Sequence, residues 1–302
     1  MLDMTEYLIK QYDESFIEKQ VEIGNTYANR WIAYGQTPVE QVKERYSAED
    51  FDPETRLYCF KGDEMVGFIG ANIREVEENE IKIKRAQTRL AFTLPGHEEA
   101  FGLLYNQLIE VLMQKEVSEI DTPQTILNDD YYQRAEKLGF SKQQEFNNIF
   151  MCDISKMTPF KTDYEIIDYN HDTDVEQVKS MLNAAYPNLE GENLENYVNR
   201  MATNENLESY RVIKEGDEIL AYCATTSGNA ENTAQTSLLV GKSSGLKRHL
   251  ISDALLGLKE KGFKQAVIFL NLNLELEKEE AEDFKSIGFE EVGTVDLLRK
   301  KL

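Results

Sequence analysis

An internal repeat constrains this 302-residue chain more than any other feature. Three short segments recur in the same order in both halves, at offsets of 157, 154 and 149 residues. They are Tyr7–Asp13 with Tyr164–Asn170, Gly62–Val66 with Gly216–Leu220, and Lys137–Phe140 with Ser286–Phe289. A period near 150 is far longer than the roughly 20–50 residues of solenoid repeats. The sequence therefore predicts a duplicated domain.

The repeat also sets the expected domain boundaries. The first copy is expected over residues 1–154 and the second over residues 164–302, and each has the usual domain size of about 150 residues. Residues 155–163, which contain Pro159, are the expected linker.

The hydrophobic pattern of each copy predicts the same order of elements: a strand, two helices, three strands, a helix, a strand, a helix and a last strand. The long third helix, over Glu98–Lys115 and Ser244–Lys261, has apolar residues at helical spacing. The last helix stops in both copies at a glycine, Gly139 or Gly288, which is followed by phenylalanine. This order is typical of a mixed α/β fold, in the α+β sense.

The net charge of the chain limits the classes of molecule that it can bind. Asp and Glu total 55 against 33 Lys and Arg, so the formal net charge is −22. Such a charge repels nucleic acid and anionic membranes, and we expect neither as a partner. No run of 18 apolar residues occurs, and the acidic N-terminus lacks the pattern of a signal peptide. We therefore expect a cytoplasmic protein.

The cysteines and histidines are few and scattered. Cys59, Cys152 and Cys223 form no CxxC pair and lie in apolar, strand-like stretches, so we expect buried free thiols. The three histidines form no HExxH motif and have no cysteine neighbours. We expect no metal site.

The ordered landmarks resemble the Gcn5-related N-acetyltransferase (GNAT) family in tandem. Ala135–Phe140, with the sequence AEKLGF, is close to the family's YEKLGF, and the resemblance covers both halves. It implies two tandem GNAT-like domains, each a mixed, largely antiparallel, splayed sheet that is flanked by helices and admits acetyl-CoA between two central strands.

The resemblance implies a bacterial-type enzyme that transfers acetyl from acetyl-CoA to an amine of a small molecule or peptide. Two alternatives stay open. One is a catalytically silent module that retains a ligand cleft, and the other is a purely structural pair of domains. The oligomeric state is not readable from the sequence.

By resemblance, the second half is the better candidate for acetyl-CoA. The family's phosphate loop reads Arg/Gln-x-x-Gly-x-Gly/Ala, and the matching loop has Lys at its first and last positions. The implied cofactor-binding residues are Leu239, Val240, Lys242, Ser243, Ser244, Gly245, Leu246 and Lys247. Lysines here, with Arg248 beside them, suit a pyrophosphate. The alternative is an ordinary Ser-capped helix start with solvated lysines.

The first half departs further from the family. Its loop, Pro95–Gly102, is one residue short, and Glu98 and Glu99 lie where phosphates should bind, so it is expected to be degenerate. One feature points the other way. Asn128 lies eleven residues before Gly139, where the family often has an Asn that binds the pantetheine arm. Asn128 is equally a candidate helix N-cap, and Glu277 takes the corresponding place in the second half.

The catalytic residues are not evident. Many family members have a Tyr four residues before the stop glycine as general acid, and Ala135 and Phe284 stand there instead. Neither can donate a proton. Tyr131 and Tyr132 on the same helix are substitutes or packing residues. Trp31, the only tryptophan, lies on the first helix, where the family walls its acceptor site, or else packs in the core.

Overall fold

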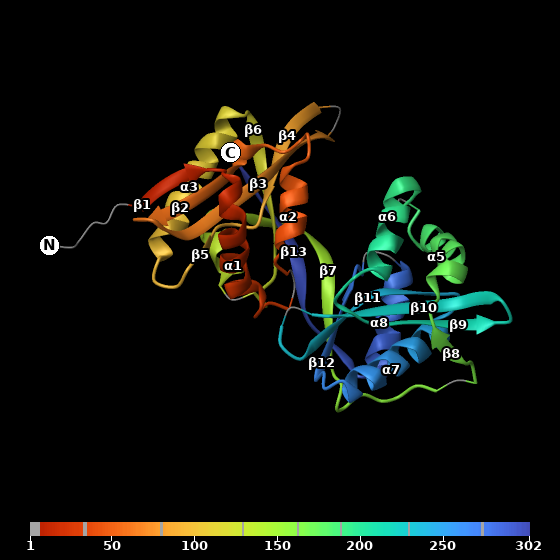
Figure 1. The fold of residues 1–302 in the computed structure, drawn as a ribbon. Helices are drawn as coiled ribbons and strands as arrows, with labels where there is room; N and C mark the ends of the chain where they lie inside the picture. Colours follow the sequence, from red (N-terminus) through yellow and green to blue (C-terminus); the bar gives the residue numbers. More distant parts are fainter. Residues whose placement is uncertain are drawn as a thin grey trace. The chain divides into compact units, whose positions relative to one another are not determined.

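The protein is described by a computed structural model that covers residues 7–32, 35–78, 81–128, 130–161, 163–187, 189–228, 230–272 and 275–302. The chain divides into two compact units (Figure 1). Unit 1 comprises Met1–Phe146 and Thr294–Leu302, and unit 2 comprises Asn147–Gly293. Among the described residues, no helix combines the length and the apolar character needed to cross a membrane.

Unit 1 has the predicted order of elements. Its helices are α1 (Ile17–Ala28), α2 (Val39–Tyr46), α3 (Glu98–Gln114) and α4 (Tyr131–Lys137). Its strands are β1 (Tyr7–Gln11), β2 (Arg56–Lys61), β3 (Glu64–Glu78), β4 (Ile81–Thr88), β5 (Phe92–Thr93), β6 (Val117–Gln124) and the beginning of β7 (Ser141–Asp153). The end of β13 (Phe289–Lys301) joins them. Neighbouring strands run antiparallel except for β4 and β6, which are parallel.

Unit 2 repeats this arrangement. Its helices are α5 (His171–Ala185), α6 (Gly191–Ala202), α7 (Ser244–Glu260) and α8 (Glu275–Ile287). Its sheet has the order β7–β12–β11–β10–β9–β8, with β8 (Ile166–Asp168), β9 (Leu207–Glu215), β10 (Glu218–Ser227), β11 (Thr233–Gly241) and β12 (Gln265–Leu270). Again one pair, β11 and β12, is parallel and the others are antiparallel.

The duplicated landmarks have the same backbone conformation in both units. Gly62 and Gly216, in the hairpin turns, both have φ of +62°. The glycines that end the last helix of each unit also have positive φ, at +89° for Gly139 and +117° for Gly288. Glycine adopts this region without steric cost, which explains why it recurs at these places. The mixed α/β fold and its tandem repetition are confirmed.

The final strands depart from the expected boundaries. β7 begins in unit 1, but Asn148–Asp153 pair with β12 in unit 2. β13 begins in unit 2, but Asp296–Lys301 pair with β6 in unit 1. Neither unit therefore matches residues 1–154 or 164–302. The physical reason is that a strand pattern predicts pairing without specifying the partner strand.

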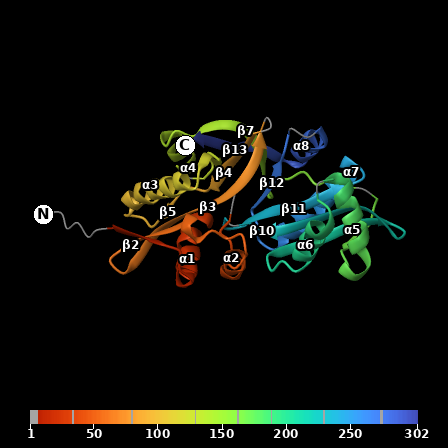
Figure 2. The same cartoon turned by 90° about the horizontal axis from the view of Figure 1, so that it is seen from above.

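Two apolar layers cover opposite faces of the unit 2 sheet. Residues of α7 and α8 pack with Ala221 and Cys223 of β10. Residues of α5 and α6 pack with Tyr222 and Ala224, the alternate positions of the same strand. Successive side chains of a strand point to opposite faces, so these helix pairs lie on opposite sides of this sheet. Figure 1 shows α5 and α6 on one side of it and α7 on the other, and Figure 2 looks onto α5 and α6.

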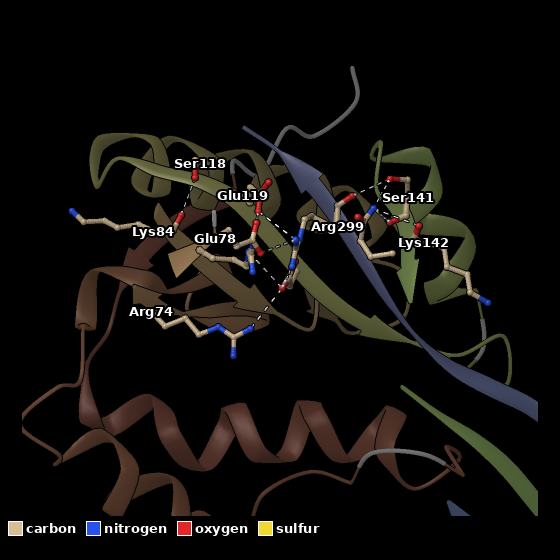
Figure 3. A network of polar contacts seen from close by, with 11 residues as sticks. Arg74, Glu78, Lys84, Ser118, Glu119, Ser141, Lys142 and Arg299 are labelled. Atoms are coloured by element: carbon tan, nitrogen blue, oxygen red, sulfur yellow. Dashed lines mark hydrogen bonds and ion pairs between the residues drawn. The ribbon is translucent and has the colours of Figure 1, made fainter. Parts of the chain in front are cut away.

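A cluster of charged side chains ties the end of the chain to the unit 1 sheet. Arg299 on β13 donates from Nε (2.6 Å) and Nη2 (3.0 Å) to the buried carboxylate of Asp121 on β6. Arg85 on β4 binds Glu78 at 2.6 Å and Glu119 through Nε at 3.0 Å. Figure 3 shows Arg299, Glu78 and Glu119 converging. Two donors on one carboxylate make a strong and directional pair.

Replacing Arg299 tests this attachment. In Arg299→Met the Asp121 carboxylate stays buried, loses its bidentate partner and keeps only Arg74 at 3.7 Å and Arg85 at 3.9 Å. The free energy of unfolding of unit 1 should therefore fall by about 1.5–3 kcal/mol, the contribution of hydrogen bonds to a charged group. Urea unfolding followed by Trp31 fluorescence measures it, since this single tryptophan belongs to unit 1. The control is Arg45→Met, at an exposed arginine of the same unit. An equal fall in the free energy of unfolding in both variants would contradict a stabilising role for the Arg299–Asp121 pair.

All three cysteines are buried free thiols. Burial raises the pKa of Cys59 and of Cys152 to about 11 and that of Cys223 to about 12. The thiolate is the reactive form, so the native protein should release almost no thionitrobenzoate from Ellman's reagent at pH 8. The unfolded chain should react at all three positions. Rapid reaction of the native protein would contradict the burial of these side chains.

Candidate functional site

Each unit has one place where two parallel strands diverge. In unit 2, β11 pairs with β12 only over Thr233–Gln235 and then continues to Gly241 against β10 alone. In unit 1, β4 pairs with β6 over Lys84–Gln87, and β5 pairs with β3. Beyond these points one strand edge has no strand partner among the residues that the structure describes. Its backbone N–H and C=O groups must be satisfied by side chains, water or a ligand. We call these places the openings of the two sheets.

Aromatic side chains fill the opening of unit 1. Tyr131 on α4 is fully buried, and its hydroxyl donates to the Ala91 carbonyl at 2.7 Å. Its ring lies 5.1 Å from that of Trp31 and 5.6 Å from that of Tyr27, which come from the α1 side. The Tyr27 hydroxyl in turn donates to the Thr93 carbonyl. The strand edge that a ligand would need is thus bound by the protein's own side chains.

A carboxylate already lies at the start of the following helix, α3. The Glu98 side chain accepts a hydrogen bond from the Gly96 N–H at 3.1 Å. Bonds from the Glu98 and Gly96 backbone N–H groups lower the pKa of this carboxyl. A helix N-terminus favours an anion, and here the chain supplies it.

The opening of unit 2 contains charged side chains instead. Lys247 on α7 forms an ion pair with Glu280 on α8, and both side chains are buried. One turn earlier on α8, the Glu277 carboxylate accepts the backbone N–H of Asn271. Burial raises the pKa of Glu280 and of Glu277, although Lys247 opposes the effect.

The same two carboxylates influence a tyrosine at the end of α5. Tyr186 ends α5, on the face opposite α7 and α8. Partial burial and the carboxylates of Glu277 and Glu280 raise the pKa of its hydroxyl. Lys247 and Glu280 are in direct contact, and both influence the pKa of Glu277. We call these three residues, together with Tyr186, whose pKa Glu277 and Glu280 influence, the polar cluster.

The loop predicted to bind pyrophosphate lies beside the polar cluster. Ser243 is the N-cap of α7, and its Oγ accepts the Leu246 N–H at 3.5 Å, so the helix start is Ser-capped. Gly245 in the first turn faces open space. Perturbed carboxylates next to an accessible helix start are typical of functional sites.

Each cation predicted for the phosphates already has a carboxylate partner. Lys242 is half-exposed and pairs with Glu218, and Arg248 lies 3.3 Å from Asp283. Lys247 is buried rather than solvated. Leu239 and Val240 at the end of β11 are also buried, in the layers on opposite faces of the sheet. A bound pyrophosphate would have to compete with these carboxylates.

The remaining predicted residues lie in the cores or in structural contacts. Ala135 is fully buried, and the Phe284 ring packs 5.3 Å from that of Phe289. The Tyr132 hydroxyl donates to Asp296 at 2.8 Å, and burial together with this contact raises its pKa to about 12. Asn128 is buried two positions before Asp130, which is the N-cap of α4, so Asn128 is not the cap.

Sequence reasoning missed Glu280 and Tyr186. A signal for Glu280 was present, because it follows Glu277 by three residues and such residues share one helix face. No local pattern identifies Tyr186, whose role depends on the opening of the sheet. No group of three or more described His, Cys, Asp or Glu side chains is arranged to bind a metal ion.

The position of Phe284 gives a direct test. Phe284→Tyr should bury a hydroxyl among apolar side chains and lower the free energy of unfolding by about 1–3 kcal/mol. The same change at the exposed Phe146 should leave stability nearly unchanged. Thermal unfolding of both variants measures the difference. An unchanged melting temperature for Phe284→Tyr would mean that the hydroxyl finds a partner in the opening.

Comparisons with known proteins place this fold. No family model and no curated protein matches the chain. Among solved structures, a tandem GNAT protein from the clavulanic acid biosynthesis pathway has TM-score 0.66 at 10% identity, with 98% of each chain covered. A GCN5-related N-acetyltransferase from Sphaerobacter thermophilus has TM-score 0.56 at 10% identity, covering 98% of this chain and 95% of that one.

A third structure contains the fold as part of a larger protein. It is a GCN5-related glucosamine N-acetyltransferase region of a fungal multi-domain GH3 beta-N-acetylglucosaminidase, with TM-score 0.57 and 11% identity. The match covers 98% of this chain but only 38% of that one. The chain has the GNAT fold, and it has it in tandem. At these identities the likeness defines the fold alone.

Proposed function

We propose that the chain is an acetyl-CoA-dependent N-acetyltransferase whose reaction takes place in unit 2. The carrying observation is the contrast between the two openings. In unit 1 the opening is filled by Tyr131 and its aromatic neighbours. In unit 2 the buried Lys247–Glu280 ion pair lies beside the opening, and burial together with Glu277 and Glu280 raises the pKa of the Tyr186 hydroxyl. Unit 1 then has a structural role or binds a different ligand.

The residues of unit 2 suggest how acetyl-CoA would be held. The free edge of β11 at Leu239 and Val240 offers backbone groups to the pantetheine arm. The first turn of α7, with Ser244, Gly245 and Leu246, offers N–H groups to the pyrophosphate. Lys242 supplies an adjacent cation once it exchanges Glu218 for a phosphate. The paired state supports binding by exchange of an ion pair rather than by a free cation.

The polar cluster supports the proton transfers. The amine nitrogen attacks the thioester carbonyl, the C–N bond forms, and the C–S bond breaks. The amine must lose a proton, and the Glu277 carboxylate, with its raised pKa, is suited to accept it. The leaving thiolate must gain one, and the Tyr186 hydroxyl keeps its proton at neutral pH and is suited to donate it.

The acceptor is proposed to be an amine of a small molecule or peptide. With a net charge of −22, the chain attracts cationic amines over anionic molecules at long range. Three buried free thiols and the need for acetyl-CoA support a cytoplasmic location.

A catalytically silent module is the second candidate. Two observations favour it: the Lys247–Glu280 ion pair already occupies the opening, and the usual Tyr position holds the core residue Phe284. Release of CoA thiol in the presence of an amine panel distinguishes the candidates. Turnover establishes the enzyme, whereas saturable binding of acetyl-CoA without turnover establishes the module.

Two variants of one ion pair test where acetyl-CoA binds. Lys242→Glu should weaken binding by about 1–3 kcal/mol, the contribution of a charge-assisted hydrogen bond. Glu218→Gln frees Lys242 and should strengthen it. Calorimetry on the full chain measures both, and both effects should shrink at high salt.

The control for net charge is Lys261→Glu, at a half-exposed lysine that pairs with Glu208 elsewhere in unit 2. It should leave affinity close to that of the wild type. Equal effects of Lys242→Glu and Lys261→Glu would remove the loop from the proposed site. No binding of acetyl-CoA by the wild-type chain would refute the proposed function.

A further inference from the structure

Unit 1 contains a cavity beside its filled opening, with Trp31 as a shared wall. It has a volume of about 970 Å³ and lies among α1, α2 and the strands β2, β3 and β4. Its walls include Trp31, Tyr46, Phe51, Arg56, Phe68 and Asn72. Cavities of this size are typical of small-molecule sites.

The cavity concentrates positive charge in a strongly acidic chain. Five basic residues line it: Arg45, Arg56, Lys84, Arg89 and Lys115. Only two carboxylates line it, Asp50 and Asp52. Lys115 pairs with Asp52 at 2.9 Å and with Glu54 at 2.5 Å, and Lys84 lies 3.6 Å from Glu116, so the arginines supply most of the positive charge. A cation-lined cavity in a protein of net charge −22 favours an anionic ligand locally, against the field of the whole molecule.

Arg56 carries a charge that no described carboxylate neutralises. Its Nη1 donates to the Thr55 hydroxyl at 2.8 Å and to the Ala71 carbonyl, and its Nη2 donates to the Asn72 side chain. All of these acceptors are neutral. By contrast, Arg85 and Arg299 of the same unit pair with carboxylates. A guanidinium without a counter-ion is a favourable partner for a carboxylate or phosphate group.

The Arg56 side chain is also held in one orientation. Its guanidinium lies 5.3 Å from the ring centre of Tyr46 and 5.5 Å from that of Phe51. Its aliphatic part packs on Gly70, where an added Cβ would come within 2.8 Å of Cδ. A binding group fixed in advance loses little entropy on binding. The glycine and the two rings thus present the charge to the cavity.

We propose that this cavity binds a small organic anion whose carboxylate or phosphate group pairs with Arg56. The apolar body of the ligand lies against the aromatic wall formed by Trp31, Phe68 and Phe92. The site belongs to unit 1 and does not depend on acetyl-CoA binding in unit 2.

The single tryptophan makes the proposal testable on the full chain. Trp31 lines the cavity, so its fluorescence reports binding there. Benzoate and phenyl phosphate serve as anionic probes, and benzamide serves as the neutral analogue of benzoate. We expect a saturable change with at least one anion and a dissociation constant for benzamide about tenfold or more higher. The stronger of the two anions identifies the preferred head group.

Variants assign the charge to Arg56. Arg56→Met should weaken the anion about tenfold or more and leave benzamide binding unchanged. Arg56→Lys retains the charge without the planar guanidinium, so its affinity for the anion should lie between those of the wild type and Arg56→Met. Arg200→Met on the exposed surface of α6 and Lys242→Glu in unit 2 should have no effect. If Arg56→Met does not fold, two measurements still test whether Arg56 binds the anion. They are the affinity of Arg56→Lys and the difference in affinity between benzoate and benzamide.

Three results would overturn the proposal. They are no saturable fluorescence change with either anion up to about 10 mM, equal affinity for benzoate and benzamide, and unchanged anion affinity in a folded Arg56→Met. If the wild-type chain binds the anion but not acetyl-CoA, the proposed function is refuted and the anion site is not. The two proposals therefore fail separately.

Discussion

Arg299 reaches the buried Asp121 carboxylate with two N–H groups, and this pair determines where the last strand of the chain must lie. A buried carboxylate is costly without a partner. The end of β13 therefore has to complete the unit 1 sheet, although residues 147–293 before it form unit 2. Neither repeat is consequently a self-contained stretch of sequence. A chain cut at the linker would leave the unit 1 sheet without its last strand and Asp121 without Arg299.

Duplication has given the two units one scaffold and different interiors. Both sheets diverge beside a long helix, at the same point of the element order. In unit 1 the space is closed by Tyr131, and Glu98 supplies an anion to the helix start. In unit 2 it holds the polar cluster. The aromatic rings in unit 1 stabilise the sheet where its strands diverge, because packed aromatic pairs add to the free energy of burial.

The positive charges of the chain show why burial and pairing matter more than sequence position. Lys242, Lys247 and Arg248 look like a phosphate site in the sequence, and each pairs with a carboxylate in the structure. Arg56, which no motif singles out, lies in a cavity among neutral acceptors. A cation's availability depends on its neighbours in space, and these come from distant segments.

The sequence by itself determined the duplication, the mixed α/β order and the glycine turns, because these depend on local conformation and on periodicity. It also indicated the buried thiols, since their apolar neighbours are local in sequence. Only the tertiary structure decided which sheet each final strand completes, that Tyr131 fills one opening and that Lys247 pairs with Glu280 beside the other. These contacts join residues far apart in the chain, and their energy depends on burial and distance, which local sequence does not encode.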